Sequence, residues 1–174
     1  MSGSLMNSPA VTFLLVVPST VIWSYFSFGV VLAIGLARIF LHGDWQKSRG
    51  FDRLILFGPL FYAAPLAAFG TEHFTLAKAI ASIVPAWMPW HLFWAYFVGV
   101  AFIAAALAIV ARKMARTASI LLGTMFFIWV IILHLPRVAA NPRNGDEVTS
   151  LLVALAMSGV SFILAESFAS DLSA

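Results

Sequence analysis

The stretch LFWAYFVGVAFIAAALAIVA at residues 92–111 decides the fold class of this chain. It contains no charged residue, no Asn, no Gln and no Pro. An α-helix rises about 1.5 Å per residue, so about twenty apolar residues cross the roughly 30 Å hydrocarbon core of a bilayer. The stretch therefore predicts a transmembrane helix, and this helix sets the depth of the polar groups that flank it.

The composition of the whole chain favours a membrane protein. Of its 174 residues, 62% are hydrophobic and 10% are charged, which leaves too little polar surface for a soluble domain of this length. The net charge of +3 comes from basic residues spread over short loops, as is typical of membrane helices, and we exclude nucleic-acid binding. The chain has no Cys, which excludes disulfides, thiolate nucleophiles and thiolate metal sites.

Four further segments carry the pattern of a membrane span. Each is a long apolar run with no charged side chain at its centre. Pro59 and Pro65 lie inside one of them and predict a kink, whose freed carbonyl groups neighbouring helices must satisfy. The sequence therefore predicts an all-α integral membrane protein that crosses the bilayer five times. The four further segments are residues 18–41, 54–70, 117–135 and 148–168.

The remaining segments differ in character. Residues 75–84 have helical apolar spacing but are too few to cross a bilayer, so they predict a short interfacial helix that the PAWMPW turn ends. Residues 135–147 are rich in Pro, Asn and Gly and predict a loop. We expect residues 1–17 to form a flexible N-terminal segment and residues 169–174 to form a short C-terminal tail.

The basic residues are distributed unevenly between the two ends of the predicted spans. Seven lie at one end, and three, Lys78, Arg137 and Arg143, lie at the other. Cytoplasmic loops carry an excess of Lys and Arg, so the end with seven is predicted to be cytoplasmic. Five spans then place the N-terminus outside and the C-terminus inside. The seven residues are Arg38, Lys47, Arg49, Arg53, Arg112, Lys113 and Arg116.

Three motifs follow one another along the second to fourth spans. They are PLAAFGTEHF at residues 65–74, IVPAWMPWHLFWAYFVGVAFIAAAL at residues 83–107 and ILHLPR at residues 132–137. Over residues 54–168 the chain resembles the DoxX-like family of bacterial membrane proteins. The resemblance implies a four-helix transmembrane bundle in the bacterial inner membrane. An additional transmembrane helix and a basic cytoplasmic loop, at residues 18–53, precede that unit.

The resemblance implies a connection to redox chemistry without implying one activity. Relatives are linked to quinone-coupled thiosulfate oxidation and to thiol and oxidative-stress defence, while others have unknown roles. The absence of Cys from this chain argues against direct thiol chemistry by this protein. Whether the chain is itself an enzyme stays open at this point.

Four side chains on the predicted outer side are candidate ligands. Glu72 and His73 lie just past the second span, His91 begins the third, and His134 lies in the last turn of the fourth. All four are therefore expected at one depth. Three neutral imidazoles and a carboxylate suit zinc, copper or iron, and the same groups can hydrogen-bond a quinone headgroup. The sequence predicts a transition-metal site or a quinone pocket at this level.

Two further residues belong to the candidate pocket. Tyr96 lies near His91 on the third span. Arg137 lies one turn beyond His134, and we expect it to bind an anion or to pair with Glu72. A lipid-headgroup pocket and a purely structural polar cluster are the other interpretations, because His is common at membrane interfaces and Arg binds lipid phosphate.

Two functions from different classes follow. In the first, the protein is a redox-associated accessory whose outer pocket binds a quinone or a metal. In the second, it is a non-catalytic scaffold whose small-residue helix faces dock onto another membrane protein or a second copy of the chain. These faces comprise Gly29, Ala33 and Ala37 on the first span and Ser150, Ala154 and Ser158 on the last.

Overall fold

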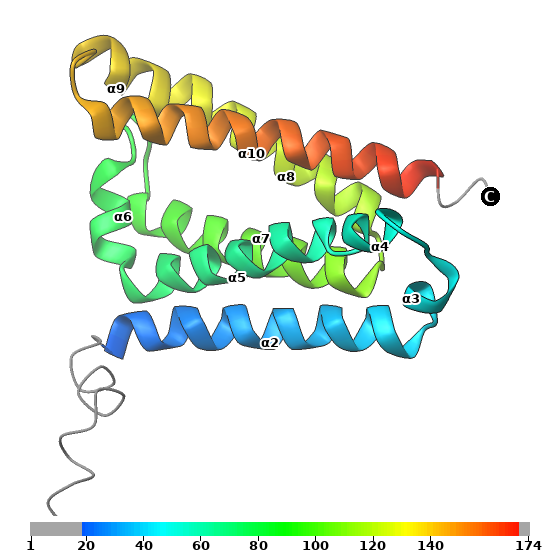
Figure 1. Cartoon of the computed structure of the whole chain (residues 1–174). Helices are drawn as coiled ribbons and strands as arrows, with labels where there is room; N and C mark the ends of the chain where they lie inside the picture. The colour runs from blue at the N-terminus through cyan, green and yellow to red at the C-terminus, as the bar shows by residue number, and fades with distance from the viewer. Residues whose placement is uncertain (1–18, 171–174) are drawn as a thin grey trace, which may run out of the picture.

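Long helices dominate the structure, a computed structural model that describes residues 19–170 (Figure 1). No strand occurs within this range. The predicted flexible segment at residues 1–17 lies outside the described residues, as do residues 171–174. The elements are α2 (Ser19–Leu41), α3 (Asp44–Lys47), α4 (Asp52–Ile55), α5 (Gly58–Thr75), α6 (Ala77–Ile83), α7 (His91–Ala111), α8 (Ala115–Trp129), the π-helical turn η1 (Val130–His134), α9 (Leu135–Ala140) and α10 (Gly145–Ser170).

Five helical stretches are long and apolar enough to cross a bilayer. Large apolar side chains on their outer faces, such as Trp23, Phe61 and Ile163, are exposed, and lipid is the solvent that suits them. The predicted fold class is therefore confirmed: the chain is an all-α, multi-pass membrane protein, and the short α6 joins its second and third spans. The five stretches are Val21–Leu41, Asp52–Thr75, His91–Ala111, Ala115–Ala140 and Gly145–Ala169.

The spans pack in two groups, as Figure 1 shows. In one group α5 packs against both α2 and α7, and in the other α10 packs against α8. The contact between α7 and α8 joins the two groups. Successive spans run in opposite directions, so α6 and α9 lie at one end of the bundle and α3 and α4 at the other.

Two glycines allow α5 and α7 to touch backbone to backbone. A Cβ atom added at Gly99 would lie 2.8 Å from the Cβ of His73 and 3.0 Å from the carbonyl oxygen of Gly70. A Cβ atom added at Gly70 would lie 2.7 Å from Cγ1 of Ile103. Small residues permit this close helix contact in membranes, where dispersion contacts between helices replace the hydrophobic effect as the driving force. The contact holds His73 directly against α7.

Hydrogen bonds between helices connect the two groups. The hydroxyl of Tyr62 on α5 donates to the carbonyl oxygen of Met157 on α10 over 2.9 Å and also bonds the hydroxyl of Ser161. Within the second group, the buried hydroxyl of Ser158 on α10 donates to the carbonyl oxygen of Gly123 on α8 over 2.9 Å. These bonds satisfy polar groups that lipid cannot solvate, and they fix how α10 lies on its neighbours.

The second span is longer than the sequence predicts. Its expected end is at residue 70, but α5 continues to Thr75. The hydroxyl of Thr71 lies 2.8 Å from the hydroxyl of Ser27 on α2, and this contact gives a polar residue a partner inside the bundle. Glu72 and His73 therefore belong to the last turns of α5 and do not follow it.

The prediction of a loop at residues 135–147 is wrong for the first half of this segment. The chain remains helical through η1 and α9 as far as Ala140. In η1 the backbone N–H of Leu135 donates to the carbonyl oxygen of Val130, five residues earlier, which widens the helix. Pro136 has no N–H and crowds the carbonyl four residues before it, and the wider turn accommodates this ring without ending the helix.

Candidate functional site

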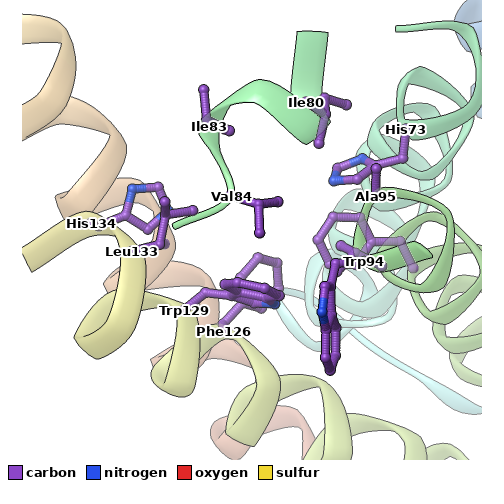
Figure 2. Close-up of a pocket in the computed structure, with 13 residues that line it drawn as sticks. His73, Ile80, Ile83, Val84, Trp94, Ala95, Phe126, Trp129, Leu133 and His134 are labelled. Carbon is purple, nitrogen blue, oxygen red and sulfur yellow. The ribbon is translucent and has the colours of Figure 1, made fainter. Parts of the chain in front are cut away.

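A cavity of about 240 Å³ lies between the two groups of helices, at the end where α6 and α9 are found (Figure 2). Six elements and the chain segment after α6 contribute to its walls. Helices α5, α6 and α7 form one side, and α8, η1 and α10 form the other. The lining residues are His73, Ile80, Ile83, Val84, Trp94, Ala95, Val98, Phe102, Phe126, Trp129, Leu133, His134 and Ala154.

Aliphatic and aromatic side chains make up most of the cavity wall. Among the described lining residues, imidazoles come from His73 and His134, and indole N–H groups come from Trp94 and Trp129. The indole of Trp94 already donates to the carbonyl oxygen of Pro89 over 3.1 Å. The cavity is therefore apolar with a few polar groups, the usual composition of a site for a small organic ligand.

Two aromatic pairs join α7 to the fourth span beside the cavity. The rings of Phe102 and Phe126 are stacked, with centroids 5.1 Å apart and planes 27° from parallel. The rings of Trp94 and Trp129 meet edge to face, with centroids 6.1 Å apart. Both geometries are the favourable ones for aromatic pairs. They give the cavity flat, rigid walls on which a planar ring can pack.

His73 enters the cavity from the last turns of α5 (Figure 2). Its Nδ1 lies 2.7 Å from the carbonyl oxygen of Phe69, one turn earlier. Its ring meets Phe102 edge to face, with centroids 5.1 Å apart. A carbonyl oxygen accepts and never donates, so Nδ1 carries the hydrogen of this bond. The backbone of α5 and the ring on α7 thus set both the orientation and the hydrogen position of His73.

His134 enters from the opposite wall, at the last residue of η1 (Figure 2). Its Nδ1 is buried and has no hydrogen-bond partner among the described residues. The neighbouring Leu133 also lines the cavity, so the π-helical turn presents two successive residues to it. Such turns occur frequently at functional sites. A buried polar atom without a protein partner has hydrogen-bonding capacity left for a bound molecule or a water.

The short helix that the sequence predicts at the membrane interface, residues 75–84, is observed as α6 and has a further role. Ile80, Ile83 and the following Val84 cover one side of the cavity. Ile80 and Ile83 are three residues apart and therefore lie on one face of α6, while Val84 follows the helix in extended backbone. The sequence alone does not say which surface this face packs against.

The structure brings together two of the six predicted site residues. His73 and His134 line one cavity, whereas Glu72, His91, Tyr96 and Arg137 are not among its lining residues. Depth along the helices does not separate these groups, because all lie toward the same end of the bundle. The two sets of residues are separated instead by the lateral positions of their helices and by the rotation of each helix about its axis.

The predicted metal-ligand set is not assembled. Glu72, His73, His91 and His134 all lie among the described residues, yet no three His, Asp or Glu side chains in this part of the chain lie close enough to hold a metal ion. Structural and catalytic zinc sites need three or four such protein ligands. The described residues therefore do not supply the three protein ligands that such a zinc site needs.

The prediction that Arg137 pairs with Glu72 is also wrong. Its guanidinium binds the carboxylate of Glu147 at the start of α10, and not Glu72, with Nε 2.7 Å from Oε2. A second bond runs from Nη2 to Oε1 of the same carboxylate. This two-bond geometry is the strong form of an Arg–carboxylate pair. It uses Arg137 to fasten α9 to α10 across the short loop between them.

The two predicted small-residue faces have different surroundings. Ala154 is buried on the cavity wall and Ser158 bonds α8, so this part of the α10 face packs inside the protein. The prediction that a partner docks at Ala154 is therefore wrong. Gly29, Ala33 and Ala37 on α2 are exposed.

Comparisons of this chain with protein-family models, with curated proteins and with solved structures gave no significant match. The resemblance to the DoxX-like family therefore stays a prediction. The function has to be inferred from the shape and chemistry of the cavity.

Proposed function

We propose that this protein binds a quinone-type molecule in the cavity between His73 and His134, and that it serves a redox process of the bacterial inner membrane as an accessory protein. One observation carries the proposal: two imidazoles stand on opposite walls of an otherwise apolar, aromatic cavity (Figure 2). A quinone is a flat apolar ring with a polar oxygen at each of two opposite edges. Ring and cavity therefore have the same distribution of polar and apolar groups.

The size of the cavity agrees with this ligand class. An apolar cavity of about 150 Å³ holds one benzene molecule. The present cavity of about 240 Å³ leaves room for the substituents that a quinone ring carries. Its stacked and edge-to-face aromatic walls suit a planar ring, and the tail of a lipid-soluble quinone can remain in the surrounding bilayer.

The distribution of charge suggests which leaflet the cavity faces. Seven basic residues lie toward the end of the bundle that carries α3 and α4, and the cavity lies at the opposite end. An excess of Lys and Arg marks the cytoplasmic side. The proposed orientation therefore opens the cavity toward the outer leaflet, with the N-terminus outside and the C-terminus inside.

Binding can be measured with decylubiquinone, because quinones quench tryptophan fluorescence and Trp94 and Trp129 line the cavity. Purified protein in lipid nanodiscs should show saturable quenching. Replacing Ala154, on the cavity wall, by Phe should fill the cavity and weaken binding about tenfold or more.

The matched control is Ala104→Phe, which adds the same ring to a lipid-exposed position of α7. It should leave the affinity for decylubiquinone unchanged. The absence of saturable quenching in the unsubstituted protein, or equal affinities for the Ala154→Phe and Ala104→Phe variants, would overturn the proposed site.

A scaffold role is the second candidate function, and the exposed face of Gly29, Ala33 and Ala37 on α2 favours it. This face is not used for packing within the described chain, and small residues permit close contact with another membrane helix. Under this proposal Ala33→Phe disrupts a complex with a membrane partner or with a second copy, while substitutions at His73 and His134 leave that complex intact. Co-purification from mildly solubilised membranes measures both.

A further inference from the structure

We infer that the cavity discriminates between the two redox forms of its ligand and binds the hydroquinone more tightly than the quinone, with His73 as the specificity-determining residue. The inference rests on the proposed function, because it assumes that a quinone-type molecule occupies the cavity. It goes beyond that function by stating which redox form the protein selects, and it assigns the selection to Nε2 of His73.

The hydrogen bond between His73 and Phe69 determines which nitrogen of the ring can accept. Nδ1 lies 2.7 Å from the carbonyl oxygen of Phe69, and only a protonated Nδ1 can form this bond. A neutral imidazole carries one ring hydrogen. Nε2 of the neutral ring therefore has a lone pair and no hydrogen, which makes it an acceptor.

The surroundings of His73 keep the ring in this state. Phe102 packs edge to face against it, and the close contact of α5 with α7 at Gly99 holds its Cβ in place. These contacts and the hydrogen bond to Phe69 favour the observed orientation of the ring. The lining of the cavity is mostly apolar, and an apolar surrounding disfavours a charged imidazolium ring.

The two redox forms differ in what they offer to Nε2. The oxygens of a quinone only accept hydrogen bonds, so a quinone oxygen beside Nε2 would face a second acceptor. A hydroquinone carries O–H groups, and one of them can donate to Nε2 of His73. A buried acceptor that is left without a donor is costly, and the resulting difference in affinity is about tenfold to a hundredfold.

His134 does not impose the same restriction. Its Nδ1 has no partner among the described residues, so no described hydrogen bond at this nitrogen decides which nitrogen carries the hydrogen. The ring can donate to a quinone oxygen or accept from a hydroquinone hydroxyl by changing its tautomer. The selectivity between redox forms therefore comes from His73.

The test compares the dissociation constants of decylubiquinol and decylubiquinone under anaerobic conditions, with the protein in nanodiscs. We expect the quinol to bind about tenfold more tightly, or better. Tighter binding of the reduced form also raises the midpoint potential of the bound two-electron couple, by about 30 mV for each tenfold preference. A redox titration of the bound ligand measures this shift independently.

The variant His73→Gln tests the role of the imidazole. A Gln amide both donates and accepts, so this variant should bind both forms with affinities within about threefold of each other. The matched control is His91→Gln, the same substitution outside the cavity lining, which should keep the preference of the unsubstituted protein. Nitrogen NMR of isotope-labelled histidine reads the tautomer of His73 directly and needs no substitution.

The possible outcomes separate the inference from the proposed function. Equal binding of both forms, tighter binding of the quinone, a preference that survives His73→Gln, or a neutral His73 ring with its hydrogen on Nε2 would each overturn the inference while leaving the quinone site in place. If neither form binds, the proposed function itself fails.

Discussion

The hydroxyl of Tyr62 on α5 donates to the carbonyl oxygen of Met157 on α10 over 2.9 Å. The two residues are far apart in the chain and belong to the two groups of helices whose separation forms the cavity. This bond, together with the contact of Tyr62 with Ser161, sets how far α10 lies from α5. It is therefore a structural support of the cavity that contributes no atom to its lining.

Replacing Tyr62 by Phe should lower the free energy of unfolding by about 0.5–1.5 kcal/mol, because the bonds to α10 are lost while the ring stays packed. Reversible denaturation in mixed micelles measures this change. The same substitution at Tyr25, whose side chain is 63% exposed, serves as the control and should have no measurable effect. An equal loss for both variants would contradict a specific role of the Tyr62 bonds.

The variant Gly99→Ala should lower the free energy of unfolding by about 1–3 kcal/mol and weaken quinone binding. Its Cβ would lie 2.8 Å from the Cβ of His73, so α5 and α7 must move apart and His73 with them. Gly159→Ala is the matched control, because an added Cβ there has no neighbour within 4 Å. Thermal unfolding and quinone titration of both variants measure the two effects. A Gly99→Ala protein with the stability and the affinity of the Gly159→Ala control would contradict the close contact.

Pro136→Ala should weaken quinone binding without lowering stability. Alanine restores an N–H that can donate four residues back, which favours a regular α-helix over the wider turn and thereby rotates His134 relative to α8. Titration with decylubiquinone and thermal unfolding measure the two effects separately. Pro142→Ala in the loop before α10 should change neither, and unaltered binding by Pro136→Ala would show that η1 does not depend on this proline.

Glu147→Gln should loosen α9 while leaving quinone binding unchanged. The neutral amide removes the charge that the guanidinium of Arg137 binds through two hydrogen bonds, so backbone amides of α9 should exchange with solvent faster. Hydrogen exchange followed by mass spectrometry measures this. Asp146→Asn removes a neighbouring carboxylate that forms no such pair with any described residue, so it should leave hydrogen exchange in α9 unchanged.

The proposed orientation can be tested by labelling single introduced cysteines. The chain itself has no Cys, so the unsubstituted protein gives no background labelling. Asn144→Cys, in the loop between α9 and α10, should react with a membrane-impermeant maleimide in intact spheroplasts. Gln46→Cys, in α3 at the other end, should react only after lysis. The reverse pattern would invert the proposed topology, and labelling of both in intact cells would contradict the five spans.

Much of the fold could be predicted from the sequence, because each span is recognisable as an apolar segment long enough to cross a bilayer. The five spans and α6 follow from this signal, and the alternation of the spans brings His73, His91 and His134 to one end of the bundle. The predictions that fail are local. The hydroxyl of Thr71 bonds Ser27 on α2 within a helix that continues to Thr75, and η1 accommodates Pro136 within a helix.

The candidate site could be predicted only in part. Sequence determines how deep a side chain lies, because the hydrocarbon thickness fixes where each helix enters and leaves the membrane. Which side chains at one depth face each other depends on the lateral order and rotation of the helices, and packing between their surfaces sets both. The contact of Gly70 with Gly99 holds α5 against α7 next to His73, which lines the cavity, while His91 at the same end lies outside its lining. For this reason the sequence determined the level of the imidazoles, and only the tertiary structure decided which two share a cavity.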